Sequence, residues 1–249
     1  MKLGVYLINL DSSVDRLKQA DAELKKHHMD YIRISAVDGR QLDVQNFDLY
    51  NAARSNAYTG RDLIGSEIGC YLSHKKALET FVNSDADYGL ILEDDLKLNE
   101  DFNLILKKSL SIIQKQNINW AVINVAANKK KLAREFATVQ QYGLFKAYYF
   151  PILALGLLWT KRGAQQFLSE MKEIYTPIDV EIQAWACETG LGLSIYPAIV
   201  QPSGVDSDID ANTLAQKKNS LRIDRFAPRQ KRMWRNKLNA IKHLYFKSN

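Results

Sequence analysis

The sequence contains little cysteine, and its cysteines are not spaced to form a disulfide scaffold or a structural zinc site. The two that occur, Cys70 and Cys187, lie far apart, and neither has a C-x-x-C partner. Such low usage suits a reducing compartment. Cys70 falls within a helical pattern of apolar residues, so we expect its thiol to be buried.

Long apolar runs are also missing. The longest, residues 152–159, is far too short to span a bilayer. Residues 1–13 carry one lysine, a short apolar run and no small-residue cleavage site, so they do not resemble a signal peptide. We therefore expect a cytoplasmic protein that is at most peripherally associated with the inner face of the cytoplasmic membrane.

The two common glycine-rich phosphate-binding motifs are absent. Neither G-x-G-x-x-G nor G-x-x-x-x-G-K-[ST] occurs, which removes the main support for a dinucleotide-binding or P-loop protein. With 46% hydrophobic and 25% charged residues, the composition excludes a disordered chain and is typical of a globular domain. A length of 249 residues fits one large α/β domain with room for a short appendage.

Positive charge is concentrated at the C-terminal end. Residues 222–247 contain nine lysines and arginines and one acid, whereas the chain as a whole has a net charge of +6, so the rest is slightly acidic. Apolar residues recur there at helical spacing: Trp234, Leu238, Ile241 and Tyr245. A basic amphipathic helix of this kind favours an anionic membrane surface as a partner. Packing of the apolar face on the catalytic domain and dimerisation are the alternatives.

Strand and helix patterns alternate along the chain, which predicts an α/β sandwich. Strands are expected at 3–10, 31–35, 88–92, 120–125, 144–150, 155–160 and 194–196, and helices at 14–28, 64–81, 102–113, 161–174 and 178–187. Residues 41–62 are polar and weakly patterned, so we expect a surface excursion, that is, an irregular segment on the surface. Residues 126–142 are polar and rich in lysine, so we expect a mobile loop that becomes ordered on binding a donor substrate. The expected division is a catalytic domain at 1–215, with halves at about 1–125 and 126–215, and a basic tail at 216–249.

Three consecutive acids, Glu93, Asp94 and Asp95, follow a buried strand. Adjacent carboxylates repel one another and need a positive partner to stay ionised, and carboxylate oxygens suit Mn²⁺ or Mg²⁺. Alternate residues of an extended segment point the same way, so Glu93 and Asp95 can share a metal while Asp94 meets a ribose hydroxyl. The alternative is a solvated acidic turn that caps the next helix.

Two further polar segments are placed to meet a nucleotide. Asn9 ends the first predicted strand, where its amide can read a base or ribose, and Arg16 can meet a phosphate with its planar guanidinium. Ser73 and His74 are polar residues in an otherwise apolar helix whose start carries two glycines. The alternatives are a helix cap with a surface arginine, and a structural histidine.

An acid pair, Asp179 and Glu181, follows Pro177 in the first turn of a predicted helix. One of them can act as a general base at the edge of a cleft. Two acids that merely complement the helix dipole are the alternative. The sequence does not fix which of the two faces the cleft; we prefer Asp179 and keep Glu181 as the second candidate.

Taken in order, these segments resemble glycosyltransferase family 25, the lipooligosaccharide glycosyltransferases. The matching stretches are VYLINLDSSVDRL (5–17), ISAVDG (34–39), GSEIGCYLSHKKAL (65–78), LILEDDL (90–96), TKRGAQQFL (160–168), PIDVEIQ (177–183) and QPSGVDSDI (201–209). The resemblance implies a GT-A-type fold, in which a mixed central sheet is flanked by helices. It also implies a UDP-sugar donor, most often UDP-galactose, and usually Mn²⁺.

Carried over position by position, the resemblance implies a set of donor-binding residues: Asn9, Leu10, Arg16, Ala36, Asp38, Gly39, Ser73, His74 and Asp94. Glu93 and Asp95 take the place of the metal-binding D-x-D. The sequence departs from the family pattern in two places. The first acid is Glu rather than Asp, which favours Asp95 as the main ligand, and residues 12–14 lack the extra arginine that the family often has, so phosphate contact depends on Arg16.

The function expected from the resemblance is an inverting, metal-assisted transfer of galactose to a lipid-linked lipooligosaccharide or lipopolysaccharide glycan. Two alternatives come from other classes: a metal-dependent enzyme or binder of nucleic acid, and an inactive sugar-binding relative. No nucleic-acid motif occurs and the basic residues lie outside the catalytic segments, so we expect no nucleic-acid partner. The intact acidic triplet argues against an inactive relative.

Overall fold

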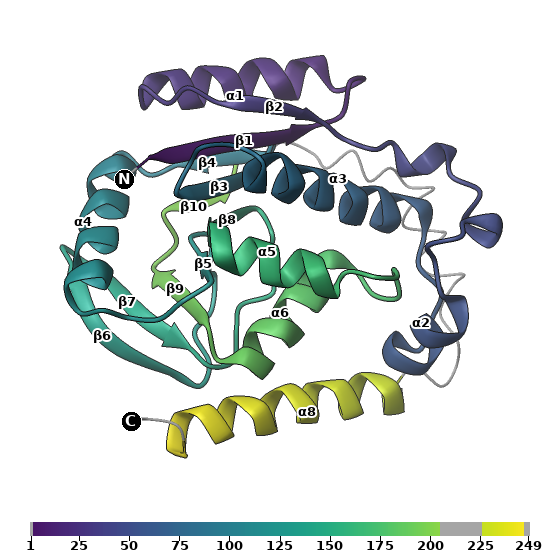
Figure 1. Cartoon of the computed structure of the whole chain (residues 1–249). Helices are drawn as coiled ribbons and strands as arrows, with labels where there is room; N and C mark the ends of the chain where they lie inside the picture. Colours follow the sequence, from purple (N-terminus) through teal and green to yellow (C-terminus); the bar gives the residue numbers. More distant parts are fainter. Residues whose placement is uncertain (1, 205–225, 247–249) are drawn as a thin grey trace.

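A computed structural model describes residues 2–204 and 226–246 of the chain (Figure 1). Its centre is an eight-stranded sheet, and a two-stranded sheet packs beside it. In spatial order the strands of the large sheet are β2 (Ile32–Ser35), β1 (Leu3–Asn9), β3 (Tyr88–Glu93), β8 (Gly156–Thr160), β5 (Val122–Asn124), β9 (Gly192–Tyr196), β7 (Tyr142–Ala147) and β6 (Ala133–Val139). The small sheet pairs β10 (Val200–Pro202) with β4 (Leu96–Leu98).

The sheet is mixed, because β1 runs parallel to β2 and β3, whereas β8 is antiparallel to both of its neighbours. Helices cover both faces. They are α1 (Val14–Lys26), α2 (Ala52–Thr59), α3 (Gly65–Val82), α4 (Phe102–Lys115), α5 (Lys161–Glu170), α6 (Ile178–Thr189) and α8 (Phe226–Tyr245), with short 3₁₀ helices η1 (Gly39–Gln41) and η2 (Val44–Asn46). The expected α/β class, a mixed central sheet flanked by helices, is confirmed.

Two hydrophobic cores lie on opposite faces of the sheet. Successive residues of a strand point to opposite faces, and the central strands divide accordingly. On β1, Tyr6 and Ile8 pack with α3, α5 and α6, whereas Val5 and Leu7 pack with α1 and α4. This explains why β1 and β3 read as continuous apolar runs: both of their faces are covered.

A glycine contact places the loop after β2 against the beginning of α3. A Cβ atom added to Gly39 would lie 1.8 Å from the carbonyl oxygen of Gly65, and one on Gly69 would lie 2.5 Å from that of Val37. Only hydrogen atoms fit in these gaps, so the two backbones touch directly. The two glycines that the sequence marks at this helix start therefore serve backbone packing.

The prediction of a mobile loop at 126–142 is wrong for the second half of that segment. Residues Ala133–Val139 form β6, an edge strand that pairs antiparallel with β7, with a register shift between Glu135 and Ala137. One side of an edge strand faces solvent, so β6 can be polar without being a loop. The surface excursion at 41–62 likewise contains η2 and α2.

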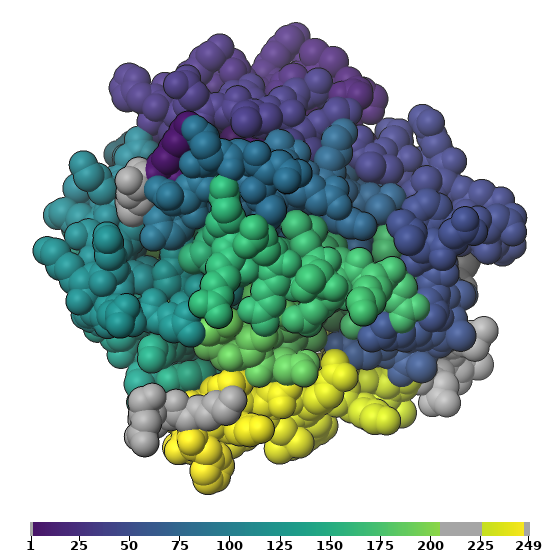
Figure 2. Space-filling view, viewed as in Figure 1, coloured from purple at the N-terminus to yellow at the C-terminus, as the bar shows by residue number. Residues whose placement is uncertain are grey.

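The C-terminal helix α8 packs on α6 and α2, and Figure 2 shows it along the lower surface of the molecule. The buried side chains of α8 are Asn236, Ala240 and His243, whereas Trp234, Leu238 and Tyr245 stay exposed. The docked face is therefore polar and small, and most of the apolar stripe faces outward. Residues 205–225, which include most of the QPSGVDSDI segment and the start of the expected tail, lie outside the described residues.

No helix within 2–204 or 226–246 combines the length and the apolarity needed to cross a membrane.

Replacing Gly69 by Ala tests the glycine contact. The added methyl group would collide with backbone atoms of Val37 and Gly39, which cannot move without shifting the loop. We expect the free energy of unfolding to fall by about 1–3 kcal/mol or more. Thermal and urea unfolding measure the change, with Ser66→Ala in the same helical turn as the control. Equal stability of Gly69→Ala and wild type would show that the two backbones are not in contact.

Candidate active site at the ends of β1 and β3

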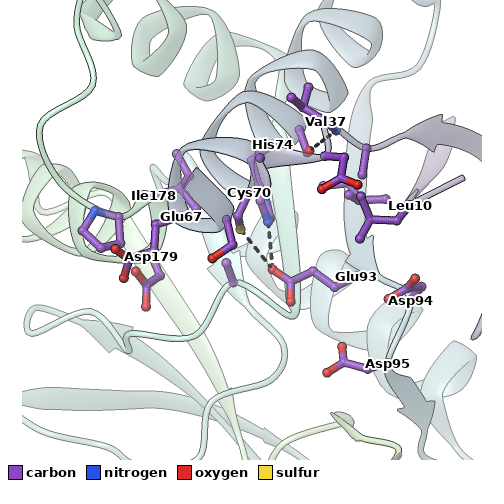
Figure 3. Close-up of a pocket in the computed structure, with 18 of the residues that line it drawn as sticks. Leu10, Val37, Glu67, Cys70, His74, Glu93, Asp94, Asp95, Ile178 and Asp179 are labelled. Carbon is purple, nitrogen blue, oxygen red and sulfur yellow. Dashed lines mark hydrogen bonds and ion pairs between the residues drawn. The ribbon is translucent and has the colours of Figure 1, made fainter. Parts of the chain in front are cut away.

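A cavity of about 580 Å³ opens where β1 and β3 end. Ile8 lies opposite Glu93 in the parallel register, so the polar residues that follow the two strands meet at one edge of the sheet. The loop after β2, the beginning of α3 and the beginning of α6 complete the wall (Figure 3). The cavity brings together all but one of the residues expected from the sequence: Asn9, Leu10, Arg16, Ala36, Asp38, Gly39, Ser73, His74, Glu93, Asp94, Asp95 and Asp179.

Asp94 is the buried member of the acidic triplet, and protein groups hold its carboxylate. Asn9 Nδ2 donates to Asp94 Oδ2 at 2.6 Å, and Arg16 forms an ion pair with Asp94 Oδ1. The other end of the Asn9 amide accepts from Arg33 Nε at 3.0 Å. Asn9 and Arg16, which the sequence predicts to bind the ligand, therefore also neutralise the Asp94 carboxylate and hold it in place.

Ser73 and Asp38 shape the loop that faces the cavity. The Ser73 hydroxyl accepts from the Val37 N–H at 2.9 Å and donates to the Gly69 carbonyl at 2.6 Å. Asp38 takes two hydrogen bonds from the Arg40 guanidinium, which lower the pKa of its carboxyl. Both side chains thus act on the protein's own loop.

Acids outnumber bases around the cavity. Three arginines line it, and each is paired with a carboxylate: Arg16 with Asp94, Arg40 with Asp38, and Arg61 with Glu67. Three more carboxylates also line it, those of Glu93, Asp95 and Asp179. Within the described ranges, Glu93 and Asp179 have no lysine or arginine partner. Arg16, already held by Asp94, is 3.8 Å from Asp95.

Asp95 fits a bound cation. Its Oδ1 atom is shielded from solvent and has no hydrogen-bond partner in the part of the chain that the structure describes. Burial raises the pKa of its carboxyl, the Glu93 carboxylate adds to that rise, and Arg16 opposes it. A divalent ion would supply the missing partner, because carboxylate oxygens suit Mn²⁺ and Mg²⁺.

Glu93 turns away from this position. Its Oε1 atom lies 3.0 Å from His74 Nε2 and 4.0 Å from Cys70 Sγ, and Figure 3 shows both side chains reaching from α3 toward it. His74 is only 1% exposed, so its ring is held by packing.

The two candidate bases differ in position. Asp179 lines the cavity, and burial raises the pKa of its carboxyl, with Glu93 and Glu67 adding to the rise. Glu181 does not line it. It lies buried beside Tyr71, and burial raises its pKa to about 7 although the Tyr71 hydroxyl and Arg54 oppose the change.

The family model described as "Glycosyltransferase family 25 (LPS biosynthesis protein)" matches residues 2–182. The chain belongs to glycosyltransferase family 25. The match covers the elements that carry every expected site residue.

Among similar family 25 proteins, Procollagen galactosyltransferase 1 from Danio rerio is 28% identical over 181 residues, 70% of this chain and 30% of that protein. Inactive glycosyltransferase 25 family member 3 from Homo sapiens is 27% identical over 150 residues, 58% of this chain and 26% of that protein. The chain spans less than a third of the length of these relatives. A solved glycosyltransferase involved in glycosylation of the major capsid of PBCV-1 is 9% identical, with a TM-score of 0.43, over 97% of this chain and 100% of that one.

Several charged or polar residues at the site were not identified from the sequence. Arg33, Arg40 and Arg61 bind Asn9, Asp38 and Glu67, and no local pattern indicates those pairs. Cys70 was also not identified, and its expected burial is wrong: it is exposed in the cavity wall, whereas Cys187 is buried. Cys70 lies four residues before His74, which places both on one face of α3, and this spacing was the available signal.

Glu181 predicts a pH dependence of stability. Folding raises the pKa of its carboxyl from 4.5 to about 7. The protonated carboxyl therefore adds its full contribution to the stability of the fold below pH 4.5, and this contribution is lost as the pH rises through about 7. Replacing Glu181 by Gln should remove on the order of 2–3 kcal/mol of destabilisation at pH 8 and little at pH 4.5.

Urea unfolding at the two pH values measures this difference. Glu188→Gln, an exposed glutamate on the same helix, is the control and should change little at either pH. A pH-independent effect of Glu181→Gln would show that the Glu181 carboxyl does not titrate in this range.

Proposed function

We propose that this chain transfers a sugar, galactose by preference, from a UDP-sugar to a hydroxyl group of a lipid-linked lipooligosaccharide or lipopolysaccharide glycan, with inversion at the anomeric carbon. The observation that carries the proposal is that residues of the family 25 segments converge on one cavity, where Glu93, Asp95 and Asp179 form no close ion pair with a lysine or arginine of the described residues. Support for galactose comes from the names of the relatives, and support for the acceptor from the description of the family model.

The donor is proposed to lie along the edge formed by Asn9, Leu10 and the loop from Ala36 to Gly39, with Arg16 toward its phosphates. This edge lies at the carboxyl ends of parallel strands, where open α/β sheets bind their ligands. Gly39 brings backbone rather than side chain to the wall. A flat base or ribose can approach such a surface closely.

A divalent cation, Mn²⁺ or Mg²⁺, is proposed beside Asp95. The geometry favours Asp95 over Glu93 as its main ligand, because Glu93 Oε1 lies 3.0 Å from His74 Nε2. The solvent-shielded Asp95 Oδ1, which accepts no hydrogen bond from the described residues, supports this position. When bound, such an ion supplies positive charge against the diphosphate of the leaving group. A diphosphate brought next to Glu93, Asp95 and Asp179 without added positive charge would be repelled.

Asp179 is proposed to accept the proton of the acceptor hydroxyl as that oxygen attacks the anomeric carbon. Its position on the cavity wall at the start of α6 supports the assignment, and it favours Asp179 over Glu181. A direct displacement of this kind breaks the bond to UDP as the new glycosidic bond forms, and converts an α-linked donor into a β-linked product.

Release of UDP from a panel of UDP-sugars, with Mn²⁺ and a truncated lipooligosaccharide acceptor, tests the reaction. Asp95→Asn should remove the metal-dependent turnover, and Asp179→Asn should lower kcat by roughly two orders of magnitude or more with little change in UDP affinity.

Glu181→Gln is the matched control and should retain most of the turnover. A large loss in Glu181→Gln with a small one in Asp179→Asn would transfer the role of base to Glu181. Background release with every donor would identify a sugar-binding relative without activity. Oligonucleotide binding that falls steeply with salt would favour a nucleic-acid partner instead.

The exposed side of α8 is proposed to dock on an anionic phospholipid surface, where a lipid-linked acceptor is presented. The helix contains no acidic residue, and Arg229, Lys231, Lys237 and Lys242 are exposed on it. Trp234 and Leu238 are 56% and 61% exposed, and Lys237 Nζ lies 4.6 Å from the Trp234 ring centroid. Aromatic and basic side chains together are typical of an interfacial helix, and each cation adds about 1 kcal/mol at such a surface.

Sedimentation with vesicles tests this surface. Trp234→Ser combined with Leu238→Ser should lower partitioning onto vesicles containing anionic lipid at least about tenfold, because two large apolar side chains are lost. Point variants are preferred to truncation, since removing α8 would uncover α6 and α2.

Leu104→Ser, an exposed apolar residue on α4, is the control and should bind like wild type. Binding that depends neither on lipid charge nor on salt concentration would rule out an electrostatic contribution of the basic residues to membrane binding. A concentration-dependent dimer that the double variant abolishes would assign the face to a second copy of the chain.

A further inference from the structure

The cavity wall contains three metal-ligating atoms of three different chemical types. Cys70 Sγ, His74 Nε2 and a carboxylate oxygen of Glu93 all lie within 4.8 Å of one another. The distances from Glu93 Oε1 are 3.0 Å to His74 Nε2 and 4.0 Å to Cys70 Sγ. Ligand atoms of a tetrahedral zinc ion are roughly 3.3–3.5 Å apart, as its bond lengths require. Small side-chain adjustments would therefore bring the three atoms onto one ion.

The backbone arranges these ligands in advance. Cys70 and His74 are four residues apart on α3, so they project from one face of the helix, as paired ligands on a metal-binding helix do. Glu93 is the last residue of β3, and its carboxylate points toward both side chains (Figure 3). Burial holds the His74 ring in place, and the glycine contact of Gly65 and Gly69 with the preceding loop holds the start of α3.

We propose that Cys70, His74 and Glu93 bind a zinc-class divalent transition-metal ion, with a fourth coordination position that faces the donor cavity. All three side chains line that cavity, and a site with three protein ligands and one open position is the arrangement of reactive rather than structural zinc. The role of this ion rests on the proposed function, because an ion here would face the sugar donor. Binding of the ion does not depend on that function.

The chemical types of the three ligand atoms determine which metal ion binds. Thiolate and imidazole favour Zn²⁺ and Co²⁺ over Mn²⁺ and Mg²⁺, which prefer oxygen ligands. The site therefore differs from the one beside Asp95, where carboxylate oxygen is the ligand. The local charge also favours a cation, because the carboxylates of Glu93, Asp95 and Asp179 line one cavity.

A hydrogen bond between His74 and Glu93 that only positions the Glu93 carboxylate is the competing explanation. It accounts for the distance of 3.0 Å, whereas a shared ion also accounts for the Cys70 sulfur 4.0 Å from the same oxygen. The two explanations differ in one measurable property, a bond from the Cys70 sulfur to a metal.

Titration of the metal-free full-length chain with Co²⁺ tests the site, because a cobalt–thiolate bond produces intense near-ultraviolet absorption that nitrogen and oxygen ligands do not. We expect this band in the wild type, and we expect Zn²⁺ to abolish it by displacing the cobalt. Cys70→Ser should lose the band. His74→Gln and Glu93→Gln should weaken Co²⁺ binding at least about 10- to 100-fold, since even outer-shell partners contribute that much.

The matched control is Cys187→Ser, because the chain has only these two cysteines. Cys187 is buried, and burial raises the pKa of its thiol to about 12, so it should not contribute to the band. Asp95→Asn should retain the band if the two metal positions are distinct. Circular dichroism confirms that each variant is folded.

Alkylation supplies a second measurement. Iodoacetamide should modify Cys70, which is exposed, and Zn²⁺ should slow this reaction at least about tenfold. Mass spectrometry of the peptide reports the modification.

Absence of the cobalt band in folded wild type, or a band of equal strength in Cys70→Ser, would overturn the proposal. The two ideas can fail separately: a chain that shows the band but releases no UDP retains the site and loses the proposed function. A chain that releases UDP with Mn²⁺ but shows no band retains the proposed function and loses the Cys70–His74–Glu93 site.

Discussion

The repulsion among three consecutive carboxylates at the end of β3 is the constraint around which the cavity is built. The backbone sends the three side chains in different directions. Asp94 is buried against Asn9 and Arg16, and Glu93 turns to His74. Asp95 is left partly desolvated, with an oxygen that accepts no hydrogen bond from the described residues. Arg16 can satisfy only one of them well, since it is paired with Asp94 and lies 3.8 Å from Asp95. The site therefore retains a need for positive charge, which a cation can meet.

Helix α3 connects this charge problem to the rest of the fold. Its glycines touch the loop after β2, its Ser73 hydroxyl fixes the same loop, and its His74 reaches Glu93. Further along the same buried face, Leu78 and Phe81 pack into the core. One buried helix thus sets the distance between the loop after β2 and the end of β3, and any shift of the helix would change both walls of the cavity.

The C-terminal helix shows how packing can reverse what an amphipathic pattern indicates. Its apolar residues are spaced as for a buried face, yet Asn236, Ala240 and His243 meet the domain instead. Specific contacts explain this choice: the His243 ring contacts the Glu188 carbonyl at 2.8 Å, and Arg235 donates to the Tyr58 hydroxyl at 2.7 Å. Small and polar side chains allow a close approach in which His243 and Arg235 form hydrogen bonds, and the larger apolar residues are left outside.

The sequence by itself determined the order of strands and helices in the core, because apolar periodicity follows directly from burial on one or two faces. The family resemblance in the sequence also predicted that Asn9, Arg16, His74 and the acidic triplet contribute to one site, and all of them line one cavity. Tertiary structure alone decided that β6 is an edge strand, that Asp179 rather than Glu181 lines the cavity, and that Cys70 is exposed there. These outcomes depend on which element packs against which, and neighbours such as Arg61 with Glu67 or Arg33 with Asn9 are set by side-chain reach across the fold, which has no period in the sequence.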